Sequence, residues 1–260
     1  AYYRSEQYLA ARRTLKQLVD RASEPGFESF ASRALGRLVD VALRTRNFAH
    51  LDEAFAAMNK VPSASVSSAL AYARGKGLVA KKDYATAKSS LAQVDATSDL
   101  HHQAQYLLAV VAMKEATPAA PAKTDGEAQV VPPQRYAAAI DAFGKVTQLA
   151  ADTADHKRVI DMAHLAMGRL FYETNQFAQA VQAYNRIERT SPEFGTMLYE
   201  LAWVYVRLGD VDRALRALEV LAIAEPASTT LADSSLLRAD LMLRAGQFEK
   251  SLTVYRGVLS

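Results

Sequence analysis

The chain has 260 residues, of which 50% are hydrophobic and 23% are charged, and 31 basic residues against 28 acidic ones give a formal net charge of +3. This composition is ordinary for a folded protein, and the acidic residues interrupt the basic ones, which argues against the basic stripe of a nucleic-acid-binding protein. There is no cysteine, so disulfides and thiolate metal sites are excluded.

One spaced pattern recurs along the chain: a large apolar or aromatic residue, a small residue three later, and apolar residues four and then three further on. Its seven copies are Tyr8, Ala11, Leu15, Leu18; Phe48, Leu51, Phe55, Met58; Tyr84, Ala87, Leu91, Val94; Tyr136, Ala139, Phe143, Val146; Phe177, Ala180, Tyr184, Ile187; Val211, Ala214, Leu218, Leu221; and Phe248, Ser251, Tyr255, Val258. Such spacing puts all four side chains on one face of a helix, with the small residue where a neighbouring helix approaches closely. Leu51 is not small, so we expect its helix pair to sit slightly further apart.

A second helix is expected before each copy, as at 162–173 and 197–208. We expect three of these first helices to end at Asn175, Gly209 and Gly246, because such residues adopt the left-handed conformation at low cost. The shortest spacing between successive copies, from Phe177 to Val211, is 34 residues. That is the period of the tetratricopeptide repeat.

The helix pairs resemble the tetratricopeptide repeat family. Residues 164–172 and 198–205 look like first helices of that family, and Pro192 and Pro226 stand at its terminal proline position. The small position of the first helix holds Gly75, Ala109, Gly168, Ala202 and Ala239. Val39 departs from that position, and the family's early tryptophan position is degenerate. The resemblance implies an all-α fold, a right-handed α-solenoid of antiparallel helix pairs.

We expect a single solenoid over residues 1–260. It begins with a partial repeat at 1–22, and repeats follow at about 32–65, 68–101, 102–157, 161–194, 195–228 and 232–260. Both ends look cut through a longer array, since no polar capping helix follows the last repeat. Residues 117–133 are rich in proline and alanine and are predicted to be a flexible insertion, either a tolerated surface loop or a partner-docking loop.

No pattern of catalytic or metal-binding residues is present. The five histidines (His50, His101, His102, His156 and His164) lack metal-ligand spacing, and there is no HExxH, P-loop or Rossmann glycine motif. No run of about 18 apolar residues exists, so we expect no membrane span. We therefore predict no enzyme, no cofactor and no metal.

In proteins of this family the first helices line a concave face along which a peptide lies. Carried onto this chain, those positions give the candidate groove residues Tyr72, Lys76, Tyr106, Val110, Met113, Arg169, Tyr172, Tyr199, Trp203 and Val206. The last repeat has Leu236, Asp240 and Leu243 at the same positions. Tyrosine and tryptophan suit a binding surface because they offer large apolar area with few rotatable bonds. Alternatively, these rings only pack between neighbouring first helices.

Family members that bind chaperone tails use a lysine and asparagine clamp, and the clamp positions here hold Gly36, Asp40, Tyr72 and Lys76. An internal or amphipathic peptide segment is therefore the expected ligand. The sequence predicts a non-catalytic protein-interaction scaffold. Arginine outnumbers lysine and alanine is abundant, which favours a bacterial source. By analogy, we expect a cell-envelope assembly of the secretion, pilus, motility or outer-membrane type. The alternatives are a self-association module that stacks through its ends and a cytoplasmic regulatory adaptor. The compartment stays open, with the periplasm or envelope favoured.

Overall fold

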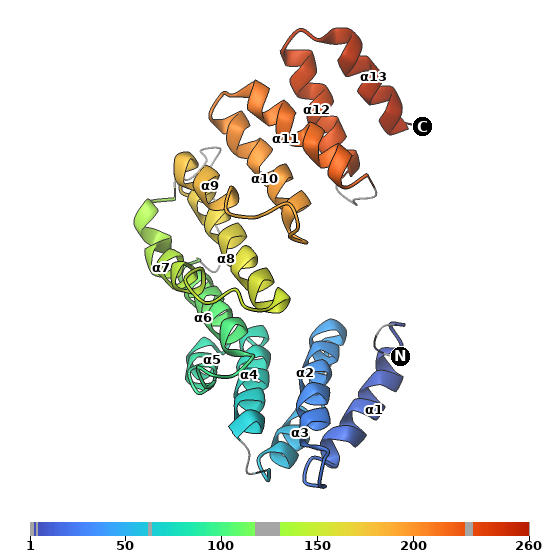
Figure 1. The fold of residues 1–260 in the computed structure, drawn as a ribbon, viewed down its shortest axis with the longest axis vertical. Coiled ribbons are helices and arrows are strands. Elements are labelled where there is room, and N and C mark those ends of the chain that lie inside the picture. Colours follow the sequence, from blue (N-terminus) through green and yellow to red (C-terminus); the bar gives the residue numbers. More distant parts are fainter. Residues whose placement is uncertain (1–2, 4, 62–63, 118–130, 227–230, 260) are drawn as a thin grey trace, which may run out of the picture. The chain divides into compact units, whose positions relative to one another are not determined.

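The computed structural model describes residue 3 and residues 5–61, 64–117, 131–226 and 231–259. These residues form thirteen α-helices and one short 3-10 helix, and they contain no strand (Figure 1). The chain divides into two compact units, Ala1–Ala119 and Ala120–Ser260. The fold class is therefore all-α, as predicted.

Unit 1 contains six helices. They are α1 (Tyr8–Asp20), α2 (Glu28–Thr45), α3 (Leu51–Met58), α4 (Ala64–Ala80), α5 (Tyr84–Leu91) and α6 (His101–Ala116). Helix α2 packs against α1 and α4, and α4 turns back into its partner α5 (Figure 1). One core cluster contains residues of α1, α2, α3 and α4, among them the fully buried Leu35 and Val39. A second cluster, around Leu91, contains residues of α4, α5 and α6.

Unit 2 contains one 3-10 helix and seven α-helices. They are η1 (Pro133–Tyr136), α7 (Ala137–Val146), α8 (Ala154–Glu173), α9 (Phe177–Tyr184), α10 (Phe194–Arg207), α11 (Val211–Ala224), α12 (Leu231–Arg244) and α13 (Phe248–Leu259). Three antiparallel pairs follow one another, α8 with α9, α10 with α11, and α12 with α13 (Figure 1). Their shared core includes Tyr184, Leu218 and Leu221.

The repeated sequence pattern marks the buried face of each second helix. Its small residues are 2% exposed or less; they are Ala11, Ala87, Ala139, Ala180, Ala214 and Ser251. Close approach also explains two glycines of the first helices. A Cβ added to Gly75 would lie 2.5 Å from Leu91 Cγ, and one added to Gly168 would lie 2.5 Å from Tyr184 Cε1. The predicted close contacts are confirmed.

The turns that end the first helices follow the expected chemistry. Asn175, Gly209 and Gly246 have φ of 59°, 75° and 74°, in the left-handed region, so this prediction is confirmed. In unit 1, Arg46 and Lys82 take the same conformation with φ of 50° and 63°, although neither is a glycine or an asparagine. Non-glycine residues are strained there.

Local residues set two element boundaries. Helix α8 begins at Ala154, because the Thr153 side chain accepts a hydrogen bond from the His156 backbone N–H and caps the helix. The expected repeat at 102–157 therefore runs into α8. Residues 118–130 of the expected insertion lie outside the described residues. Its end at Pro133 already begins η1, since proline suits a first helical position.

The remaining predictions on organisation are not tested. Leu51 is buried at the start of α3. The wider helix spacing expected there stays a prediction, and so does the division of the chain into a single solenoid with the repeat bounds given above.

Candidate peptide-binding surface

The ten predicted groove residues lie on the first helices of both units. Unit 1 carries five of them, on α4 and α6, and unit 2 carries five, on α8 and α10. None of the ten is fully buried, so each first helix presents the predicted positions at the surface. Each unit therefore has its own candidate surface.

The surface of unit 2 exposes large apolar side chains. Trp203 on α10 is 38% exposed, and Leu236 and Leu243 on α12 are 41% and 47% exposed. The residues Tyr199 and Val206 of α10 are half-buried and pack against the core. We define the unit 2 first-helix surface by these five residues. Leu236 and Leu243 were absent from the candidate set, although the repeat register had placed them at equivalent positions.

In unit 1, the candidate cation Lys76 is already paired within the protein. Its Nζ lies 2.5 Å from Oδ1 of Asp40 on α2 and 6.0 Å from the centroid of the Tyr72 ring. Burial lowers the pKa of Lys76, but the hydrogen bond to Asp40 and the nearby Tyr72 outweigh it and raise the pKa. Burial raises the pKa of Tyr72. The charge of Lys76 is therefore balanced by a carboxylate of the neighbouring first helix.

In unit 2, Arg169 is paired in a similar way. Its Nε donates to both carboxylate oxygens of Glu200 at 3.0 Å, and its Nη2 donates to Oε1 at 2.6 Å. The buried Tyr184 hydroxyl donates to Oε2 of the same carboxylate at 2.9 Å. Burial and the charge of Glu200 raise the pKa of Tyr184. Glu200 was not among the predicted residues. The sequence feature that could have indicated this pairing is a carboxylate that follows Arg169 by about one repeat.

Tyr172 takes part in the packing of a turn. Its ring lies 5.8 Å from that of Phe177, edge to face, and the Arg207 guanidinium lies 5.8 Å from the Tyr172 centroid and 5.0 Å from the Phe177 centroid. Arg207 Nη2 also donates to Asn175 Oδ1 at 3.0 Å. At this position the ring packs between successive repeats, which was the alternative reading of the aromatic residues.

Comparison with known proteins agrees with this architecture. Residues 165–229, which span the C-terminal part of α8 and the α9 to α11 segment, match the family model described as "Tetratricopeptide repeat". This segment of the chain therefore resembles tetratricopeptide repeats. No curated protein sequence significantly matches the chain.

Several solved structures share the fold of this chain at low identity. The apo form of RapI is 8% identical with a TM-score of 0.65, over 99% of this chain and 72% of that one. The C-terminal part of a repeat-containing protein from Cytophaga hutchinsonii is 13% identical with a TM-score of 0.60, over 99% and 92%. A tetratricopeptide repeat protein from Parabacteroides merdae is 14% identical with a TM-score of 0.50, over 99% and 88%. These likenesses show the fold, an all-α arrangement of helical repeats.

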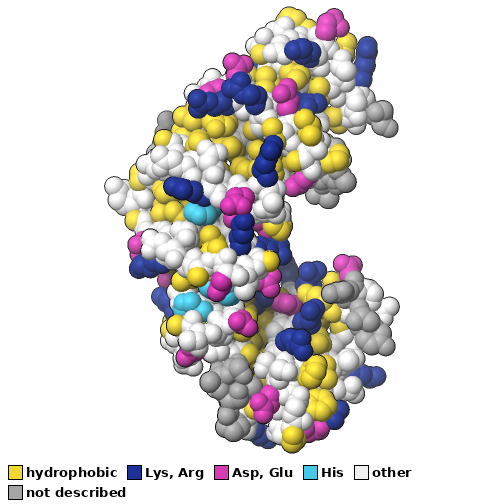
Figure 2. All heavy atoms as spheres, viewed as in Figure 1, with side chains coloured by type: hydrophobic (Ala, Val, Ile, Leu, Met, Phe, Trp, Pro, Cys, Tyr) yellow, Lys and Arg dark blue, Asp and Glu magenta, His cyan; other side chains and the backbone are white. Residues whose placement is uncertain are grey.

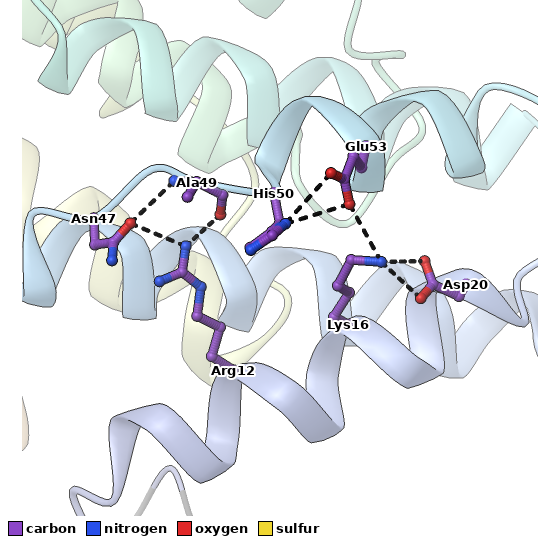
Figure 3. A network of polar contacts seen from close by, with 7 residues as sticks. All are labelled: Arg12, Lys16, Asp20, Asn47, Ala49, His50 and Glu53. Carbon is purple, nitrogen blue, oxygen red and sulfur yellow. Dashed lines mark hydrogen bonds and ion pairs between the residues drawn. The ribbon is translucent and has the colours of Figure 1, made fainter.

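Other polar clusters of the protein hold helices together. In Figure 3, Lys16 of α1 contacts Asp20 at 2.9 Å and Glu53 of α3 at 3.5 Å, and Arg12 donates to Asn47 Oδ1 at 3.1 Å. Asp20, Asn47 and Glu53 are exposed, Arg12 and Lys16 are half-buried, and the network joins α1 to α3 and the turn before it. Surface pairs of this kind contribute little individually.

In the described part of the chain, no three histidine, aspartate or glutamate side chains are grouped so that they could hold a metal ion. None of its helices is both long and apolar enough to cross a membrane. On the face drawn in Figure 2, acidic and basic side chains are interspersed among hydrophobic ones.

Proposed function

We propose that unit 2 holds an apolar or amphipathic segment of a partner protein against its first-helix surface, and that the protein acts there as a non-catalytic scaffold. The observation that carries this proposal is the exposure of Trp203, Leu236 and Leu243 on α10 and α12. Large apolar side chains left exposed together are typical of interaction sites, and tryptophan is a frequent anchor of binding energy.

The charges around this surface support an apolar ligand. Arg169 is held by Glu200, and Asp240 accepts a hydrogen bond from the Tyr255 hydroxyl. A ligand that paired with either charge would first have to displace its internal partner. An apolar segment would instead cover the exposed rings and leave both polar contacts in place, at a gain of about 25 cal/mol per Å² of apolar area buried.

The cellular setting is part of the same proposal. We propose a bacterial cell-envelope assembly, on the analogy between this architecture and the scaffolds of such machines. The alternative, self-association, is favoured by Phe248 and Leu252 on α13, which are 65% and 44% exposed. Light scattering distinguishes the two, since stacking would give a dimer or a longer array that Phe248→Ser and Leu252→Ser disrupt.

The test of the scaffold proposal is affinity capture from the source organism. The native protein would be compared with a variant that carries Trp203→Ser, Leu236→Ser and Leu243→Ser. A matched control replaces Leu9 and Ile223 by serine, because these side chains are 83% and 82% exposed and lie outside the surface. Circular dichroism checks that each variant is folded.

We expect a partner that the native protein and the control retain and the triple variant loses. The identity of that partner then tests the envelope setting. Equal retention by all three proteins, or no specific partner at all, would contradict the proposal.

A further inference from the structure

Unit 1 contains a pocket away from its predicted groove residues. It has a volume of about 200 Å³ and lies between α3 and the second half of α4. Its lining residues are Leu51, Asp52, Phe55, Arg74, Gly77, Leu78 and Lys81. The walls are therefore mainly apolar, and two cations stand among them.

One of the residues that line the pocket is a helical glycine, Gly77, and no close contact with a neighbouring helix requires a glycine there. Gly77 is buried inside α4, yet a Cβ added there would meet no atom within 4 Å. Gly75 in the same helix is different, because its added Cβ would collide with Leu91. A glycine inside a helix is less stable than an alanine. At Gly77 that cost keeps the pocket open and serves no helix–helix contact.

The two cations beside the pocket rest on aromatic rings. The Arg74 guanidinium lies 5.5 Å from the Phe55 centroid, and the Lys81 ammonium lies 5.4 Å from the Phe48 centroid. Among the described residues, neither cation has a carboxylate within ion-pair distance, in contrast to Lys76. Asp52 is the one acidic side chain of the lining.

We propose that this pocket binds an apolar side chain of a partner segment whose neighbouring residues are acidic. The apolar walls take the side chain, and Arg74 and Lys81 pair with the flanking carboxylates. A neutral or basic segment would cover these two cations without giving them a partner, which is unfavourable. This site lies in unit 1 and does not depend on the function proposed for unit 2.

The test uses a fluorescently labelled peptide of sequence Glu-Asp-Glu-Phe-Glu-Asp-Glu and measures its binding by anisotropy. Filling the pocket with Gly77→Leu should weaken binding at least about tenfold, since a buried apolar side chain loses its place. Arg74→Gln with Lys81→Gln should weaken it by a similar factor. Gly144→Leu in unit 2 is the matched control, because its added Cβ also meets open space.

A second variant separates binding from folding. Gly77→Ala should raise the melting temperature by roughly 2–4 °C, since it improves the helix. The same variant should weaken peptide binding. A protein that is more stable and binds less has lost the pocket and kept its fold.

Two comparisons of peptides test the chemistry. Replacing the phenylalanine by alanine should weaken binding, and replacing the acidic residues by lysine should abolish it. The proposal is overturned if native protein fails to bind the acidic peptide, if Gly77→Leu binds it equally, or if the lysine peptide binds as well. It is also overturned if light scattering shows a dimer that Gly77→Leu dissociates, since a second copy would then fill the pocket.

Discussion

At the level of single residues, Gly168 and Tyr184 form a tight contact. The tyrosine ring is 1% exposed and lies where a side chain at 168 would be, and its hydroxyl reaches Glu200 on the next first helix. One residue pair thus joins a first helix, its second helix and the following repeat. Sequence pattern predicted the small residue and the ring, but it gave no sign of the hydroxyl's partner.

The first prediction concerns this contact. Gly168→Ala should destabilise the protein by about 1–3 kcal/mol, because the added methyl group overpacks against a buried ring. Gly144→Ala, at an open helical position, should instead stabilise it by about 0.5–1 kcal/mol. Urea denaturation measures both. Equal effects of the two substitutions would mean that the Gly168 contact is not tight.

The second prediction follows from the raised pKa of Tyr184. A tyrosine has an ordinary pKa of about 10, and the folded value is higher, so the protonated form is favoured by folding. The stabilisation is complete below about pH 10 and is lost as the pH rises above it. Tyr184→Phe should lower stability at pH 7 by about 0.5–1.5 kcal/mol, through the lost hydrogen bond. The substitution should also make the decline in the free energy of unfolding between pH 9 and 11 shallower.

The measurement is the free energy of unfolding of both proteins across that range. Parallel curves would show that Tyr184 does not contribute to the alkaline loss of stability.

At the level of helices and turns, two turns with the same hydrogen bonds differ in one residue. After α4, Lys82 is left-handed and the Asp83 N–H donates to the Leu78 carbonyl; after α10, Gly209 is left-handed and the Asp210 N–H donates to the Tyr205 carbonyl. Both aspartates then cap the following helix, α5 or α11. The strain at Lys82 is therefore a property of that residue and not of the turn.

The third prediction uses this pair. Lys82→Gly should stabilise the protein by about 0.5–1 kcal/mol, because glycine removes the left-handed strain and offsets its own chain entropy. Gly209→Lys should destabilise it by a similar amount. Thermal unfolding compares the two. Destabilisation by Lys82→Gly would show that the lysine side chain contributes contacts that outweigh the strain.

Most of the helices could be predicted from the sequence, for a physical reason. Apolar residues spaced three and four apart define a buried helical face, and the start of each pattern lies at or near the start of its second helix, as at Tyr84 and Phe177. The early start of α8 depends on the Thr153 cap, a local hydrogen bond that the apolar pattern does not record. The left-handed Lys82 was missed because its residue type disfavours that conformation.

At the scale of the whole molecule, the repeat register predicts first-helix positions that are exposed, but it does not predict how their charges are paired. The register of the repeats placed Trp203, Leu236 and Leu243 on first helices, and these side chains are exposed. The same register placed Lys76 and Arg169 among the candidate groove residues, and the structure pairs them with Asp40 and Glu200. Such pairs join different helices, so they depend on how repeats pack. The pocket at Gly77 likewise depends on the space between two helices.

Trp203 gives the most direct test of the central claim, because it is the one tryptophan in the chain and lies on the proposed surface of unit 2. Its fluorescence would be recorded while the partner captured by the native protein is added. We predict that the Trp203 emission moves to shorter wavelengths and that acrylamide quenches it less, since the bound segment covers the ring. A partner that binds to saturation while emission and quenching stay unchanged would contradict it.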